Sequence, residues 1–182
     1  MQVRKIGTWL GLVTATAMLL GGTAAAAHGR VKAKPRVQAV ASKWLKVNAK
    51  AKTAVLTLLG GYGTNNGGMN FDGYSKGQMV VTVPFGWKVD VVFKNVGSLP
   101  HSVLVDTWNT PLSAFNPKPV FPGAESPNPV QGTPTGGSAN FHFVADKVGK
   151  FRIICAFPGH ATIGMWDTLI VSKAAKSPSI HV

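Results

Sequence analysis

Acidic side chains are the scarcest charged groups in this sequence, with 6 Asp and Glu residues against 19 Lys and Arg residues. Acid unfolds proteins mainly by protonating carboxylates whose pKa values are depressed in the native state, and their contribution to stability is lost as the pH falls. With so few carboxylates, little stability can be lost in this way. We therefore expect the fold to tolerate acid.

The basic excess does not indicate a nucleic-acid-binding protein. Arg4 and Lys5 lie at the N-terminus, and eight more cations lie between Arg30 and Lys52. The remaining cations are scattered, and no aromatic residues are interleaved with them to form a platform for bases. We expect no nucleic-acid partner.

Long apolar runs are absent except near the N-terminus. Residues 6–22 carry no charge, follow Arg4 and Lys5, and precede the small residues 23–27. This order is typical of a secretory signal, and the run is short for a membrane-spanning helix. We predict that residues 1–27 are a signal peptide, either cleaved or kept as an anchor, and that the protein works in the periplasm or at the extracytoplasmic cell surface.

Cysteine occurs once, at Cys155. A lone cysteine in an oxidising compartment can close no internal disulfide, so it is idle, paired with another chain, or a metal ligand. A c-type haem is excluded because the sequence has no C-x-x-C-H motif. A dinuclear copper site is excluded because it would need another cysteine.

Helical periodicity is absent after residue 53, where short apolar runs alternate with Gly- and Pro-rich turns. The region 107–140 holds seven of the twelve prolines and is too long for a hairpin, so we expect it to be packed and functional. The pattern predicts an all-β, antiparallel sandwich. Strands are expected at 54–59, 79–83, 87–94, 101–105, 141–144, 151–155 and 168–172.

Four segments are expected along the chain. After the signal, residues 28–52 form a basic extension in which Val37, Val40, Trp44 and Val47 recur at helical spacing. We predict a short basic helix or arm there. The sandwich domain then spans residues 53–173, and residues 174–182 form a polar C-terminal tail.

The segment from Cys155 to Met165 reads Cys-x4-His-x4-Met, with His160 in the middle. Strand alternation places Cys155 on the same face as Ile153, so its sulfur points into the sandwich. Thiolate and thioether suit Cu(I), imidazole suits Cu(II), and a blue-copper site takes two imidazoles, one thiolate and a weak axial Met. His101, at the start of a strand, is the candidate for the second imidazole. We predict one copper ion cycling between Cu(I) and Cu(II).

Other interpretations of these residues fit less well. Structural zinc prefers four Cys or His ligands and avoids Met. A Cys155 nucleophile paired with His160 would lack a positioned acid. Taken singly, each residue could be a core or turn residue, and only the combination favours copper. His142 is expected to face solvent, and His181 lies in the tail.

The combination resembles the cupredoxin superfamily and, more narrowly, the sulfocyanin family, the blue-copper proteins of acidophilic prokaryotes. The resemblance runs from about Asn48 to Ser172. The sequence is also similar to rusticyanin, the nearest alternative, in the motif that begins at Cys155. The Asn-Phe-Asp-Gly motif at 70–73 and the Leu-Pro-His-Ser motif at 99–102 favour the sulfocyanin family instead. The segments that carry it are 70–73, 83–84, 99–102, 120–123 and 155–165. The resemblance implies a cupredoxin-type Greek-key β-sandwich, copper ligands at His101, Cys155, His160 and Met165, and a role in a respiratory chain.

The expected function follows from this site. A mononuclear type 1 copper protein would shuttle single electrons in an exported respiratory chain of an acidophile, and would not be an enzyme. Its partners would be redox proteins such as a cytochrome or a terminal oxidase, and it would act as a monomer. Membrane association stays open because of the long basic stretch after the signal. The alternative is a periplasmic copper chaperone or storage protein, which would need exposed and easily exchanged ligands.

Overall fold

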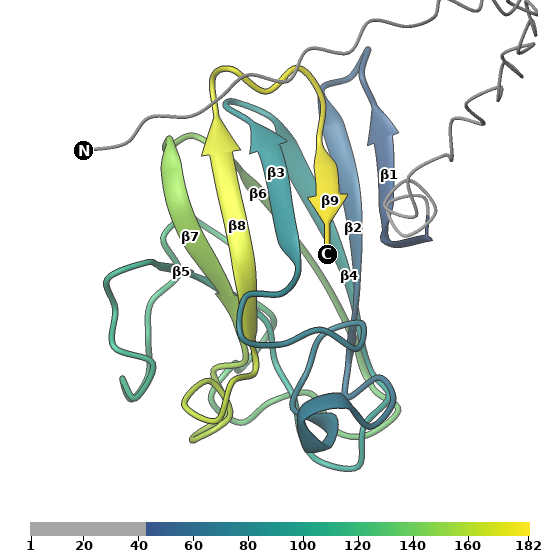
Figure 1. Cartoon of the computed structure of the whole chain (residues 1–182), viewed down its shortest axis with the longest axis vertical. Helices are drawn as coiled ribbons and strands as arrows, with labels where there is room; N and C mark the ends of the chain where they lie inside the picture. The colour runs from purple at the N-terminus through teal and green to yellow at the C-terminus, as the bar shows by residue number, and fades with distance from the viewer. Residues whose placement is uncertain (1–42) are drawn as a thin grey trace, which may run out of the picture. The chain divides into compact units, whose positions relative to one another are not determined.

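Two β-sheets face each other in the computed structural model, which describes residues 43–182 (Figure 1). Across the first sheet the strands are, in order, β1 (Leu45–Asn48), β2 (Thr53–Gly60), β4 (Lys88–Asn95) and β6 (Ser138–Val144). Across the second they are, in order, β5 (Leu104–Thr107), β7 (Gly149–Ile154), β8 (Trp166–Ser172), β3 (Val80–Pro84) and β9 (Ser179–His181). The predicted signal peptide and most of the predicted basic extension lie outside the described residues. Within residues 43–182, no helix is long and apolar enough to cross a membrane.

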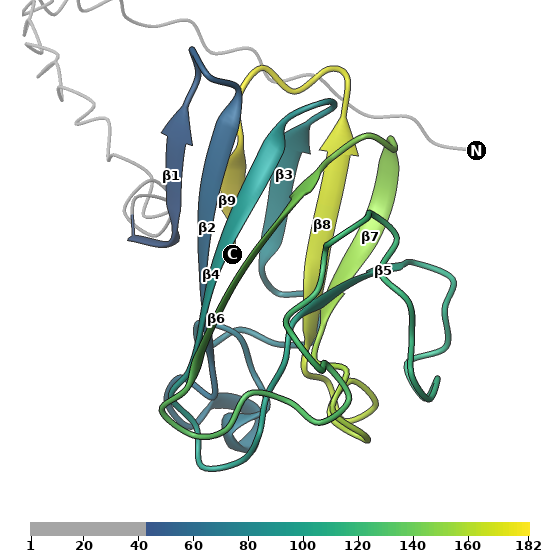
Figure 2. The ribbon, with the colours of Figure 1, turned by 180° about the vertical axis from the view of Figure 1, so that it is seen from behind.

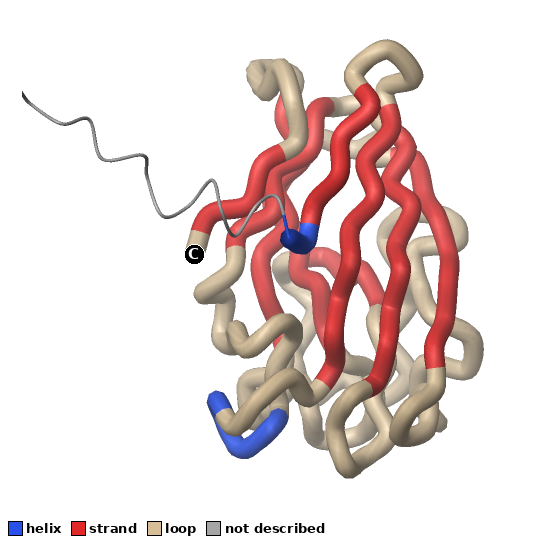
Figure 3. Tube along the Cα trace, turned by 90° about the vertical axis from the view of Figure 1, so that its right-hand side faces the viewer, coloured by secondary structure: helices blue, strands red, loops and turns tan. Residues whose placement is uncertain are grey.

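Alternating apolar residues account for the packing of the two sheets. Along β2 and β4, every second side chain is buried between the sheets. Phe121, from the long loop between β5 and β6, stacks on Phe143 with ring centroids 5.2 Å apart and meets Phe151 edge-on at 5.0 Å. The core therefore joins both sheets and the proline-rich loop. The prediction of an all-β sandwich is confirmed, as the two layers show in Figures 2 and 3.

Two strand pairs are parallel, which the sequence-based prediction of an antiparallel sandwich did not include. β2 pairs with β4 in parallel, and β3 pairs with β8 in parallel. For β2 and β4, the reason is that β3, which lies between them in the sequence, crosses to the second sheet. Its neighbours in the chain therefore lie side by side and run in the same direction.

The sandwich also extends beyond the predicted bounds of 53–173. Leu45–Asn48 forms β1 and pairs with β2, so a strand occupies part of the segment predicted as a helix or arm. Trp44 and Leu45 are buried, which explains why this segment joins the sheet. Ser179–His181 forms β9 on the edge of β3, so the predicted polar tail contributes a strand. Val37 and Val40 fall outside the residues that the structure describes.

The loops at one end of the sandwich position the candidate site (Figure 1, bottom). They follow β2, β4 and β7, and a short 3₁₀ turn, η1 (Asn65–Gly68), lies among them. The expected strand at 101–105 begins only at Leu104, because the backbone of His101 pairs with Thr133 of the long loop instead of with a strand. The long loop is packed, as predicted, since Phe121 and Ala124 are fully buried.

Candidate metal centre

His101 is held by the turn that follows β4. The buried amide of Asn95 donates to the carbonyl oxygens of Leu99 and Thr133, both at 2.8 Å, and accepts from the Gly97 N–H at 3.0 Å. The backbone of His101 exchanges hydrogen bonds of 3.1 and 2.7 Å with Thr133. Two loops that are distant in sequence therefore fix the position of this imidazole.

Cys155 and His160 lie in the loop between β7 and β8, which we call the ligand loop (residues 155–165). Cys155 N–H donates to the Met165 carbonyl at 3.0 Å, and Met165 N–H donates to the His160 carbonyl at 2.9 Å. These two bonds close the loop on itself. Gly164 has a φ of 108°, and a Cβ there would lie 2.7 Å from Cγ of Lys76, so the tight turn requires a glycine.

Three side-chain donor atoms converge between these loops. Nδ1 of His101 lies 3.2 Å from Nδ1 of His160, and Sγ of Cys155 lies 3.5 Å from the same His160 atom. All three donor atoms lie within 4.8 Å of one another. The side chains are almost sealed from solvent, with exposed fractions of 1% for His101, 0% for Cys155 and 6% for His160.

The donor set fits a small transition-metal ion. Bonds of about 2.0–2.1 Å to nitrogen and about 2.3 Å to sulfur, at angles between tetrahedral and trigonal, place two nitrogens about 3.4 Å apart and nitrogen and sulfur about 3.6 Å apart. The observed separations of 3.2 and 3.5 Å are close to these values. Two imidazoles and one thiolate are the trigonal set of a blue-copper site.

Burial sets the protonation of these groups. It lowers the pKa of His101 to about 4, with a smaller contribution from the charge of His160, and it also lowers the pKa of His160. Both imidazoles are then neutral near pH 7 and can offer a lone pair to a metal. Burial raises the pKa of the Cys155 thiol, against smaller lowering effects of hydrogen bonds from Ser102 and Phe157. A buried thiolate therefore needs a cation beside it, which a metal ion supplies.

Met165 occupies the position expected for an axial ligand in the sequence. Its side chain is fully buried, and its backbone forms hydrogen bonds with the backbones of both Cys155 and His160. The structure thus holds Met165 at the base of the ligand loop, and its role as a ligand remains a prediction.

Ser102 contacts the sulfur of Cys155, a role that was not predicted from the sequence. Its N–H donates to Sγ of Cys155 at 3.3 Å, and its Oγ lies 3.7 Å from the same sulfur. Ser102 Oγ also accepts from the Ala156 N–H at 2.9 Å. The Leu-Pro-His-Ser segment was the feature of the sequence that could have indicated Ser102. In a regular strand, however, neighbouring side chains point to opposite faces, so Ser102 would point away from the core if His101 points into it. The irregular backbone at residues 101–103 removes that constraint.

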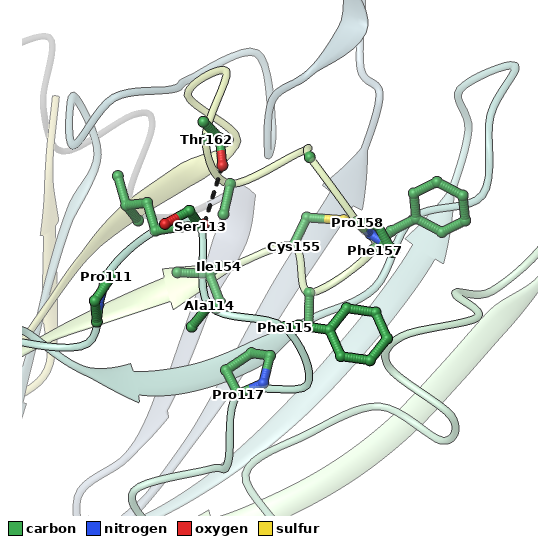
Figure 4. Close-up of a pocket in the computed structure, with 14 residues that line it drawn as sticks. Pro111, Ser113, Ala114, Phe115, Pro117, Ile154, Cys155, Phe157, Pro158 and Thr162 are labelled. Carbon is green, nitrogen blue, oxygen red and sulfur yellow. Dashed lines mark hydrogen bonds between the residues drawn. The ribbon is translucent and has the colours of Figure 1, made fainter.

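A pocket of about 250 Å³ lies beside Cys155, between the ligand loop and the proline-rich loop (Figure 4). Pro111, Phe115 and Pro117 line one side of it, and Pro158 lines the other. Thr162 Oγ1 donates to the Leu112 carbonyl at 3.2 Å, drawn as the dashed line in Figure 4. The proline-rich loop therefore covers the ligand loop next to the Cys155 sulfur.

The other histidines described here do not join the cluster. His142 lies on β6 and is exposed, as predicted, and His181 lies on β9 and is exposed. Within residues 43–182, His101, Cys155 and His160 are the one group of at least three His, Cys, Asp or Glu residues close enough to share a metal.

This two-sheet fold, with a His-Cys-His cluster under the loops at one end, defines a cupredoxin. The family model of the sulfocyanin (SoxE) domain matches residues 40–181. The chain is 32% identical to sulfocyanin of Sulfolobus acidocaldarius over 134 residues, which cover 70% of this chain and 67% of that protein. The chain belongs to the sulfocyanin family, and the resemblance stated from the sequence is confirmed. Copper is the metal that this family and the donor set support.

Rusticyanin, the predicted alternative, is also similar. Rusticyanin of Acidithiobacillus ferrooxidans is 30% identical over 105 residues, which cover 56% of this chain and 66% of that protein. A solved rusticyanin structure from Thiobacillus ferrooxidans aligns with a TM-score of 0.46 and 23% identity, covering 76% of this chain and 93% of that one. The match to the sulfocyanin domain begins before β1 and ends within β9, so it includes both strands that the predicted domain bounds left out.

Proposed function

We propose that this protein is a mononuclear type 1 copper protein that carries single electrons and catalyses no bond chemistry. The proposal depends on one observation: two imidazole nitrogens and one thiol sulfur, all buried, lie within 4.8 Å of one another. His101 and His160 would bind copper through Nδ1 and Cys155 through Sγ, with Met165 as the weak axial ligand.

The protein's part is to hold this geometry and to exclude water. A bound copper ion, cycling between Cu(I) and Cu(II), would supply the one-electron chemistry. The two histidines are anchored by separate loops, and backbone hydrogen bonds close the ligand loop, so the donors have little freedom to move. A rigid and dry site changes little between oxidation states, which favours fast electron transfer.

Membership of the sulfocyanin family and the signal-like N-terminus support a place in an exported respiratory chain of an acidophile. The protein would work in the periplasm or at the extracytoplasmic cell surface, as a monomer. It would exchange electrons with a cytochrome or a terminal oxidase. The exposed part of the ligand loop suits a protein partner: Ile163 is 54% exposed, and the Phe157 ring lies 4.7 Å from that of His160. Apolar patches of this kind mark contact sites.

A copper chaperone or storage protein is the alternative function. Such a protein must release its metal to a partner, which requires accessible ligands. Here the sulfur of Cys155 is fully buried, and neither histidine is more than 6% exposed. Burial of all three donors therefore favours the electron carrier.

The test is the visible spectrum of the copper-loaded protein and of its Cys155→Ser variant. Type 1 copper owes its intense blue colour to the thiolate ligand, so the wild type should bind one copper and turn blue when oxidised, and the variant should be colourless. His142→Ala is the matched control, because His142 is exposed and lies outside the cluster, and it should stay blue. A blue Cys155→Ser protein would show that the assignment is wrong.

A further inference from the structure

The imidazole of His101 has an outer edge that faces away from the metal cluster. Its Nδ1 lies 3.2 Å from Nδ1 of His160, so Nε2 is on the far side of the ring. There it lies against the backbone of two glycines: a Cβ added to Gly97 would lie 2.9 Å from Nε2, and one added to Gly61 would lie 3.1 Å from it. No side chain from these two glycines separates the imidazole from the space beyond.

That space is a hollow of about 470 Å³, which we call the glycine hollow. Five of the residues that line it are glycines, and none of its lining residues within 43–182 carries a charged side chain. They are Gly61, Gly63, Thr64, Gly67, Gly68, Met69, Val96, Gly97, Ser98, Leu99 and His101. A Cβ at Gly63, Gly67 or Gly68 would meet no other described atom within 4 Å, so these glycines border open space. Val96 and Leu99 add exposed apolar groups, at 41% and 45%.

The wall between the hollow and His101 is held in place. The N–H groups of Val96 and Gly97 both donate to the Gly60 carbonyl, at 2.9 and 3.1 Å, and Gly61 N–H donates to the Asn70 carbonyl at 3.0 Å. Gly61 has a φ of 74°, and a Cβ there would lie 2.5 Å from Cα of Gly97. The two backbone segments therefore approach so closely that only glycine fits, and the thin wall is a built feature.

We propose that the glycine hollow binds a small, uncharged, ring-shaped reductant of the hydroquinone class and passes its electrons to the metal through the outer edge of His101. The inference rests on the proposed copper site. Concave sites of a few hundred Å³ with apolar groups and few polar ones are typical of small-ligand sites. The lack of charge disfavours ions, and a floor of glycine backbone lets a flat ring approach the imidazole without an intervening side chain.

The electron balance requires two protein molecules for each donor molecule. One hydroquinone gives up two electrons and two protons and becomes a quinone. Two oxidised protein molecules each take one electron and are reduced. The two protons pass to solvent at the open side of the hollow. No other oxidant or reductant is needed.

Binding can be tested without electron transfer, by adding hydroquinone to the reduced protein. Reduced protein and hydroquinone do not react with each other, and Cu(I) is diamagnetic, so amide NMR signals can be followed. We expect saturable shifts at Gly63, Gly67, Gly68 and Gly97, and none in the turn at 145–148 on the opposite end. Shifts confined to the ligand loop, or no saturable shift, would overturn the proposal.

Electron transfer is tested with Ser98→Trp, which places a large side chain in the hollow from an exposed position. The matched control is Ser113→Trp, an exposed serine that lines the other pocket, beside Cys155. Ser98→Trp should slow reduction by hydroquinone at least tenfold and leave the blue spectrum, the potential and the rate with anionic hexacyanoferrate(II) unchanged. Ser113→Trp should change none of these. Thr64→Trp fills the same hollow and serves if Ser98→Trp does not fold.

Each outcome of the kinetic test is decisive. An unchanged hydroquinone rate in a folded, blue Ser98→Trp or Thr64→Trp protein would overturn the inference. So would a loss in Ser113→Trp alone, or an equal loss with both reductants, since the latter would mean a disturbed metal centre. A wild-type protein that is blue but fails these tests retains the proposed function, whereas a colourless wild type would remove the proposed function itself.

Discussion

The two contacts between Ser102 and the sulfur of Cys155 should tune the reduction potential. Because Ser102 Oγ already accepts from the Ala156 N–H, its own O–H is free to donate to the sulfur 3.7 Å away. Such a bond stabilises the electron-rich thiolate of the reduced site. Ser102→Ala should therefore lower the potential, by about 20–60 mV for a hydrogen bond of about 0.5–1.5 kcal/mol. Voltammetry of the copper protein measures this shift.

Ser126→Ala is the control for Ser102→Ala. Ser126 is also buried and also accepts a backbone hydrogen bond, from Val103 N–H at 3.1 Å, but no contact joins it to the sulfur. It should lose about 1 kcal/mol of stability and keep the wild-type potential. Equal potential shifts in both variants would mean that packing, and not the bond to sulfur, sets the potential.

The role of Met165 can be tested by Met165→Gln. A thioether is a weak, soft donor that favours Cu(I), whereas the amide oxygen of glutamine is a harder donor that favours Cu(II). The variant should remain copper-binding, and its potential should be clearly lower than that of the wild type. Since Met165 is fully buried, Met79→Gln, which changes another fully buried methionine, is the control for the cost of burying an amide. A wild-type potential in Met165→Gln would remove Met165 from the proposed ligands.

The sequence predicted the residues that converge, and it could not predict those that hold them. Cys155, His160 and His101 were identifiable because their chemistry and spacing are specific to one kind of site. Asn95 acts through carbonyl groups of Leu99 and Thr133, which are brought together only by the fold. The same holds for Gly61 and Gly97, whose close approach joins two loops from different strands.

At the scale of elements, strands were predictable where one face is buried and the other is polar. β4 largely alternates in this way, whereas β2 was predicted as a continuous apolar run, because its outer face also carries Val55 and Leu59. The predicted bounds of both strands differ by one residue at each end from those of the structure. β1 and β9 have three or four residues each, which is too short for a periodic pattern. β1 is held by its pairing with β2 and β9 by its pairing with the distant β3, so the local sequence pattern indicated only an arm and a tail.

β9 should contribute measurably to stability although it is short. Ile180 is 1% exposed and belongs to the main core. Ile180→Ala should lower the free energy of unfolding by about 2–4 kcal/mol, the range for deleting a buried aliphatic side chain. Ile163→Ala makes the same change at a 54% exposed position and should cost less than about 0.5 kcal/mol. Urea unfolding of both variants gives the comparison, and similar losses would mean that β9 is not packed as the structure shows.

For the whole molecule, the few acidic residues are placed so that acid removes little stability. The one salt bridge within residues 43–182 joins Lys88 and Asp90 at the surface, and exposed pairs contribute little. Asp72 and Asp167 are buried, and each has one oxygen, Oδ2, without a hydrogen-bond partner in the described structure. Burial raises the pKa of Asp72 to about 7 and, with a smaller effect of Asp72, that of Asp167 to about 8.

The direction of the pH dependence follows from these raised values. The folded protein keeps protons on Asp72 and Asp167 at pH values where the unfolded chain, with a carboxyl pKa of 3.8, has lost them. Stability from these two groups is therefore fully present below about pH 4 and falls as the pH rises toward 7 and 8. This is opposite to the usual behaviour of paired carboxylates, and it strengthens the expectation of acid tolerance drawn from the composition.

Asp72→Asn tests this arrangement. The amide is uncharged at every pH and keeps an oxygen to accept the Leu59 N–H, which donates to Oδ1 of Asp72 at 2.8 Å. Asparagine also tolerates the positive φ of 56° at this position. The variant should be more stable than the wild type at pH 8, by about 2–4 kcal/mol from a shift of about three pKa units, and should lose this advantage at pH 4.

Thermal melts of the metal-free and copper-loaded proteins, from pH 8 to strongly acidic pH, measure the advantage of the variant at pH 8 and its loss at pH 4. Asp90→Asn is the surface control and should change stability little. If the metal-free wild type lost stability steeply between pH 6 and 4, the buried carboxyl groups would be paired with cations in the folded protein and the proposed origin of acid tolerance would be wrong.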